Sequence, residues 1–123
     1  MAKQDAKRRT ALLEAWEETY KKGQLTFWIF LGLKERERYV DEIGAFIRET
    51  TNGTLSCEDQ SLYRTLRKYR DLGMVDYRTG PGEGGPERKY YFLTPLGKEL
   101  LKEFTSRNIQ LFYSPQIQKL IKS

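Results

Sequence analysis

Residues 56–97, SCEDQSLYRTLRKYRDLGMVDYRTGPGEGGPERKYYFLTPLG, carry the clearest structural signals in the chain. Apolar residues recur at helical spacing over 57–72, which predicts an amphipathic helix. Residues 74–78 and 87–93 then alternate apolar and polar side chains, as strands do. The segment between them, 79–86, holds four glycines and two prolines. The stretch therefore predicts a helix followed by a β-hairpin with a mobile loop that is longer than a tight turn.

Three further helices are predicted ahead of this stretch. The first covers 5–22, with Asp5 as its N-cap and a thin stripe of apolar side chains along one side. The second covers 26–35, with Thr26 as its cap. It is apolar nearly all round, which places it at the centre of a core. The third covers 40–49 and is apolar on one face.

Polar residues and proline mark the starts of the later helices. Ser56 is expected to cap the helix of the opening stretch. Thr94 caps the helix after the hairpin, with Pro95 at its first position, where proline is tolerated. That helix either extends to Phe112 or bends before it, and Ser114 begins a final short amphipathic segment. Three core helices followed by a hairpin indicate a winged helix-turn-helix, a mainly α fold with a β-hairpin wing (α+β).

The composition removes most catalytic chemistry. The chain has no histidine and one cysteine, Cys57, so Ser–His and Cys–His nucleophile pairs, Cys/His zinc sites and intrachain disulfides are all impossible. It has no phosphate-binding loop either. We therefore expect no enzyme activity, cofactor or metal. The longest apolar run, 27–33, is too short to cross a bilayer, so we expect no membrane association and a cytoplasmic location.

Basic residues gather on the predicted outer face of helix 57–72 and beside the hairpin loop, in a chain of net charge +5. Arginine can bond a guanine edge bidentately, and glutamine can do the same for adenine. Such a face is more often merely solvated, but its place before a basic, glycine-rich hairpin favours DNA. Tyr63 could touch a phosphate or pack under the hairpin. The predicted DNA contacts are Gln60, Ser61, Tyr63, Arg64, Arg67, Lys68, Arg88 and Lys89.

Several motifs resemble the PadR family of transcriptional regulators. SLY at 61–63 and LGMV at 72–75 resemble the start and exit of its recognition helix. GGPERKYYFLTPLG at 84–97 is similar to its wing and the following helix entry, and 29–43 fits the first part of the family. The sequence departs from the family at 39–43, where YVDEI stands in place of the His-Gly-Tyr-Glu-Ile of many members.

The resemblance implies a homodimeric regulator, often a repressor, that binds double-stranded DNA at a palindromic promoter site. It divides the chain into an N-terminal dimerisation helix (1–23), a winged-helix DNA-binding domain (24–94) and a C-terminal dimerisation helix and tail (95–123). Spare apolar stripes in the terminal regions also require a partner surface. The expected dimer contacts are Leu12, Leu13, Trp16, Tyr20, Leu100, Leu101, Phe104 and Phe112.

Two further expectations concern pathway and partner. The extra N-terminal helix and short C-terminal region resemble the cyanobacterial circadian period-extender branch of the family, which implies control of clock genes. The alternative function is a winged-helix module that binds another protein and never DNA, and the apolar residues at 109–121 motivate it.

Effector and redox control leave weaker signals. Some family members bind aromatic ligands through a tryptophan, but Trp16 and Trp28 lie in the N-terminal helices, where packing is the favoured role, and no effector is assigned. A helix N-terminus could lower the thiol pKa of Cys57, although a passive role is favoured.

Overall fold

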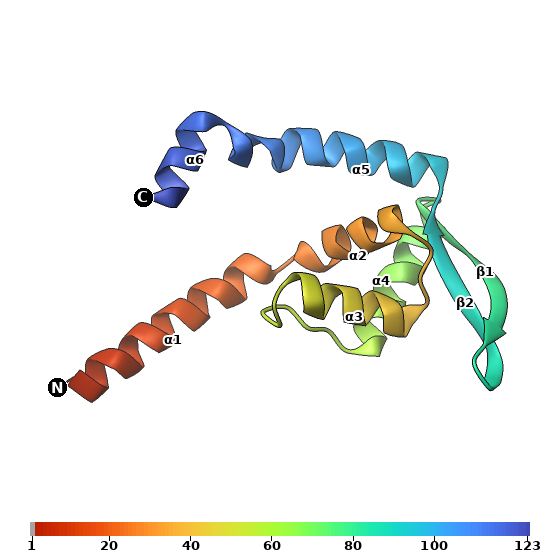
Figure 1. The fold of residues 1–123 in the computed structure, drawn as a ribbon, viewed down its shortest axis with the longest axis horizontal. Coiled ribbons are helices and arrows are strands. Elements are labelled where there is room, and N and C mark those ends of the chain that lie inside the picture. The colour runs from red at the N-terminus through yellow and green to blue at the C-terminus, as the bar shows by residue number, and fades with distance from the viewer. Residues whose placement is uncertain (1) are drawn as a thin grey trace.

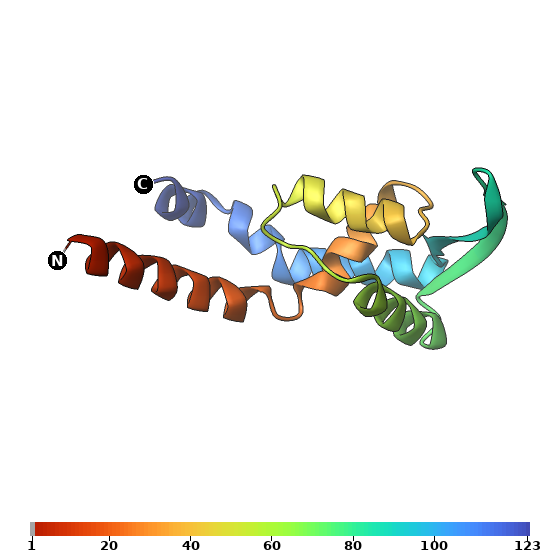
Figure 2. The same cartoon turned by 90° about the horizontal axis from the view of Figure 1, so that it is seen from below.

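The computed structural model describes residues 2–123, which fold into helices with a two-stranded antiparallel hairpin at one end of the molecule (Figure 1). This order confirms the predicted winged-helix fold of mainly α class. The elements are α1 (Ala2–Lys21), α2 (Gln24–Glu35), α3 (Val40–Thr50), α4 (Asp59–Asp71), β1 (Val75–Gly82), β2 (Gly85–Leu93), α5 (Pro95–Asn108), the 3-10 helix η1 (Gln110–Tyr113) and α6 (Pro115–Lys122). Helices α2, α3 and α4 form the centre, and α1 and α6 lie on the side away from the hairpin tip in both Figure 1 and Figure 2.

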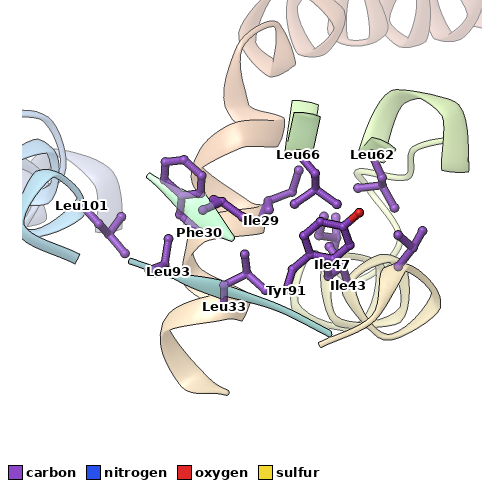
Figure 3. Packing of buried hydrophobic residues seen from close by; sticks show 12 residues of the cluster. Ile29, Phe30, Leu33, Ile43, Ile47, Leu62, Leu66, Tyr91, Leu93 and Leu101 are labelled. Atoms are coloured by element: carbon purple, nitrogen blue, oxygen red, sulfur yellow. The ribbon is translucent and has the colours of Figure 1, made fainter. Parts of the chain in front are cut away.

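The core collects one apolar face from every central element (Figure 3). Helix α2 lies in its middle, as its all-round apolar sequence predicts. Fully burying one such aliphatic or aromatic side chain stabilises the fold by about 1.5–3 kcal/mol. The buried apolar residues are Ile29, Phe30, Leu33, Val40, Ile43, Ile47, Leu62, Leu66, Val75, Tyr91, Leu93 and Leu101. Leu101 corrects an expectation, because it packs in the core of its own chain with 3% exposure and is not available to a dimer partner.

A buried arginine joins the turn between α2 and α3 to the hairpin. The backbone of Arg38 pairs with Tyr91 through two hydrogen bonds, with N–O distances of 3.1 and 2.8 Å. Its Nε donates to the carbonyl of Gly32 at 2.9 Å, and its guanidinium pairs with Glu35 and lies 4.6 Å from the ring centre of Phe46. These partners satisfy a charge that would be costly to bury alone. The charged sequence around Arg38 predicts only a turn, not this burial.

Three of the predicted N-caps are wrong. Asp5 lies inside α1, because the helix-forming residues before it are already helical. Thr26 lies inside α2, which begins directly after Gly23. The backbone of Gly23 is in the left-handed conformation, with φ 83°. Ser56 lies ahead of α4, whose N-cap is Glu58. Local capping signals therefore mark helix starts only to within a few residues here.

The hairpin corrects the prediction of a long loop. Its strands extend through the glycine-rich segment to the pair Gly82 and Gly85, and they leave a two-residue turn in which Gly84 has φ 64°. The register shifts between Gly80 and Gly82, so an irregularity absorbs one residue near the tip. The segment pairs despite its composition because glycine accepts both the tight turn and the irregularity.

The helix after the hairpin begins as predicted and ends early. The N–H of Gly97 donates to Oγ1 of Thr94 at 3.1 Å, which confirms Thr94 as the cap. Helix α5 ends at Asn108, so the bend is the correct one of the two alternatives left open for this region. Ser114 caps α6 by accepting from the N–H of Ile117 at 3.3 Å.

Close packing explains why a glycine, Gly97, stands at the end of the TPLG motif at 94–97. Thr94 donates its hydroxyl to the carbonyl of Gly73 at 2.7 Å and its N–H to the carbonyl of Met74 at 3.1 Å. This contact draws α5 so close to the exit of α4 that a Cβ on Gly97 would lie 2.0 Å from the Met74 carbonyl oxygen. The motif thus sets the angle between α5 and the winged-helix core.

We predict that Gly97→Ala destabilises the protein by about 1–3 kcal/mol, because the backbone of Met74 must move to admit the methyl group. Urea denaturation followed by circular dichroism measures the loss. Gly85→Ala is the control, since a Cβ there has its nearest neighbour at 3.9 Å. Equal stability of the two variants would contradict the packing argument.

Candidate nucleic-acid interface

The outer face of α4 presents basic side chains to solvent. Leu62 and Leu66 bury the inner face, and the opposite face exposes Arg64 and Arg67. Neither arginine makes a hydrogen bond or an ion pair within residues 2–123. Their guanidinium donors are therefore available to an external partner. Of the other predicted contacts on α4, Gln60, Tyr63 and Lys68 are exposed and Ser61 is half-buried.

Arg70, one turn further along α4, is bound within the protein. Its Nε donates to Asp76 at 3.0 Å, and its guanidinium lies 4.5 Å from the ring centre of Tyr77. The pKa of Asp76 is lowered, first by the hydrogen bond from the N–H of Tyr77 and then by the bond from Arg70. This contact ties the end of α4 to β1 and holds the basic face at a set angle to the hairpin.

The hairpin turns its two predicted DNA contacts to opposite faces, because neighbouring strand residues alternate. Lys89 shares a face with Tyr91, and its Nζ lies 4.7 Å from the ring centre of Tyr77. Burial raises the pKa of the Tyr91 hydroxyl, and Tyr63 of α4 adds to that shift. Lys89 therefore lies on the face of the hairpin that is turned toward α4. Arg88 points to the other face, with its guanidinium 4.2 Å from the ring centre of Tyr39.

The structure places further residues beside Arg88 that were not predicted from the sequence. Tyr39 and Tyr90 meet edge to face, with ring centres 5.8 Å apart. Arg78 lies over the Tyr90 ring at 4.8 Å and donates to Glu37 at 2.5 Å. The departure from the family pattern at position 39 was the one available signal for this cluster.

Cys57 lacks the lowered thiol pKa that its place near the start of a helix could have given it. It lies ahead of α4 and is half-buried against the core. Burial raises its pKa, and this effect outweighs the lowering by Arg48. A raised pKa reduces the thiolate fraction at neutral pH, which opposes the reactivity that a redox switch requires.

An open cavity of about 640 Å³ lies between α2, α4 and α5. Phe27, Phe30 and Phe104 give it an apolar lining, and Lys68 and Arg107 add charge. Within residues 2–123, no group of three or more His, Cys, Asp or Glu side chains is arranged to hold a metal ion. In the same residues, no helix combines the length and the apolar character needed to span a membrane.

A winged helix with an unpaired basic face on its third core helix defines a class, the winged-helix regulators. Similarity to known proteins identifies the family within that class. The model of the transcriptional regulator PadR-like family matches residues 29–103, and the chain belongs to this family. An uncharacterized protein of Lysinibacillus sphaericus is 30% identical over 82 residues, which cover 67% of this chain and 75% of that protein.

Solved structures agree with this assignment. A PadR-like transcription factor from Bacteroides fragilis is 27% identical with a TM-score of 0.65, and the match covers 79% of this chain and 91% of the other. Bacillus subtilis PadR in complex with operator DNA is 28% identical with a TM-score of 0.59. That match covers 65% of this chain and 45% of the Bacillus subtilis protein.

Proposed function

We propose that this protein is a sequence-specific regulator that binds double-stranded DNA as a homodimer and represses transcription from a palindromic promoter site. The observation that carries the proposal is the pair of unpaired arginines, Arg64 and Arg67, on the outer face of α4, beside the Lys89 face of the hairpin. The relative from Bacillus subtilis, solved with operator DNA, supports the DNA-binding part of this proposal. Control of circadian clock genes is the proposed pathway and rests on the helix arrangement alone.

The homodimer is proposed from apolar surface that the single chain leaves uncovered. Helix α1 contributes no buried residue and projects away from the centre (Figure 2). Trp16 is 72% exposed and Leu12 is 60% exposed. Isolated helices are marginally stable in water, so this stripe requires a packing partner. A second copy brings its own exposed stripe on α5 and η1, which includes Leu100, Phe104 and Phe112. Two-fold symmetry would place two copies of α4 about one DNA turn apart, roughly 34–36 Å.

For DNA binding, we predict different effects from the two kinds of contact. Arg64→Ala and Arg67→Ala should each weaken specific binding by about 1–3 kcal/mol and relax base preference, because they remove readers of base edges. Lys89→Ala should weaken binding to all sequences and reduce the salt slope by about one, because it removes a phosphate contact. A duplex selected from a random pool, titrated at several salt concentrations, provides the measurement.

Arg9→Ala is the matched control, because Arg9 is an exposed arginine on α1, remote from α4. Wild-type binding in the Arg64, Arg67 and Lys89 variants would refute the assignment of the DNA-binding face.

For the dimer, Trp16→Ala should raise the dissociation constant at least about tenfold, because buried tryptophans carry much of the binding energy of interfaces. Leu12→Ala should act in the same direction. Leu72→Ala is the control, since this leucine is 57% exposed but lies at the end of α4. Sedimentation equilibrium measures the change, and a wild-type protein that stays monomeric at tens of micromolar would contradict the proposal.

The alternative function, a module that binds only protein, is supported by apolar side chains on α6, where Leu120 is 67% exposed. A gel-shift assay with random duplex at low salt separates the two functions. We expect a shift, because the electrostatic part of DNA binding does not depend on sequence. No shift at micromolar protein would favour the alternative.

A further inference from the structure

We propose that Tyr39 is a positioning residue for DNA binding, and that it holds the guanidinium of Arg88 ready for a phosphate of the DNA backbone. This inference rests on the proposed function, because it concerns how one predicted DNA contact is prepared. Its physical basis is a cluster of two tyrosines, two arginines and one glutamate between the α2–α3 turn and the face of the hairpin that carries Arg88. We call it the Tyr39 cluster, and its members are Glu37, Tyr39, Arg78, Arg88 and Tyr90.

Arg88 contacts the Tyr39 ring without using its hydrogen-bond donors. The guanidinium of Arg88 lies 4.2 Å from the ring centre of Tyr39, a cation–π contact. Within residues 2–123, Arg88 side-chain N–H groups make no hydrogen bond or ion pair. A guanidinium that lies over a ring and makes no hydrogen bond of its own keeps its N–H groups available for bidentate contact with phosphate. Stacking thus restricts the side chain without using the donors that a phosphate requires.

The two arginines of the cluster differ in their partners within the protein. Arg78 lies 4.8 Å from the ring centre of Tyr90, but its Nε already donates to Glu37. The charge of Arg78 is neutralised within the protein by Glu37. Arg78 therefore supports the Tyr90 ring and does not provide a free charge. Arg88 has no acidic partner among the described residues and is the member whose charge remains for an external anion.

Tyr39 is itself held in place. Its N–H donates to a carboxylate oxygen of Glu42 at 3.2 Å, and its carbonyl accepts from the N–H of Ile43 at 3.0 Å. The preceding residue, Arg38, is held to β2 by the backbone pairing with Tyr91. The ring of Tyr39 also meets Tyr90 edge to face. A platform held from both sides reduces the conformational entropy that Arg88 would lose when it binds phosphate.

The test compares Tyr39→Ala with Tyr39→Phe, alone and combined with Arg88→Ala. Tyr39→Ala should weaken binding to all duplexes about three- to tenfold, with the preference between sequences unchanged, because a phosphate contact carries no base information. Tyr39→Phe keeps the ring and should bind as the wild type does. In the Arg88→Ala background, Tyr39→Ala should have no further effect. An equal loss in both backgrounds, or a loss in Tyr39→Phe, would overturn the proposal.

A second measurement reads the position of Arg88 without DNA. The Nε–H resonance of Arg88 should lie at a ring-current-shifted position in the wild type and in Tyr39→Phe, and return to the position of a free arginine in Tyr39→Ala. If the wild-type protein binds no DNA but shows this shift, the proposed function fails and the stacking stands. If DNA binding is normal and the resonance is the same in all variants, the positioning role of Tyr39 is refuted.

Discussion

The backbone pairing between Arg38 and Tyr91 determines how the hairpin sits on the helices. Within the part of the chain described, it is the one place where the backbone of a strand hydrogen-bonds to backbone outside the hairpin. Arg38 is 5% exposed, and a guanidinium at that depth is stable only when its charge and N–H groups have partners. The carbonyl of Gly32 and the carboxylate of Glu35 supply them. Because Lys89 lies on the same strand and face as Tyr91, this anchor also fixes where the basic face of the hairpin lies beside α4.

The exposed arginines of this protein fall into two groups, those paired with an acidic residue and those without an acidic partner. Only the three-dimensional structure shows to which group each arginine belongs. Arg70 and Arg78 are paired with Asp76 and Glu37, and they join α4 and the α2–α3 turn to β1. Arg64 and Arg67 have no such acid partner within residues 2–123. Exposed ion pairs contribute little stability, so the paired arginines matter more for orientation than for free energy. The unpaired ones keep their charge for a polyanion.

Some features set by short-range chemistry could be predicted from the sequence, although three of the predicted N-caps were wrong. Thr94 with Pro95 starts α5 because cap and proline act within one turn, and the all-round apolar pattern of α2 places it in the core. Features that depend on distant partners could not. Glu37 and Arg78 are 41 positions apart, and nothing local indicates that they meet. The apolar pattern of α5 likewise could not distinguish buried Leu101 from exposed Leu100, because both fit one helical stripe. The basic face of α4 was predictable because it follows from helical periodicity alone.

The cavity between α2, α4 and α5 lies beside both the proposed dimer surface and the proposed DNA-binding face. Phe104, on the exposed stripe of α5, and Lys68, on the exposed side of α4, both line it. A second copy packed on Phe104 would therefore extend over a space that α4 also borders. Side chains that filled this open space would contact α4 as well, so the packing that joins two copies would also act on the position of α4. The distance between two recognition helices is then a property of the dimer contact as well as of the winged-helix core, which is what binding to two half-sites at a fixed spacing requires.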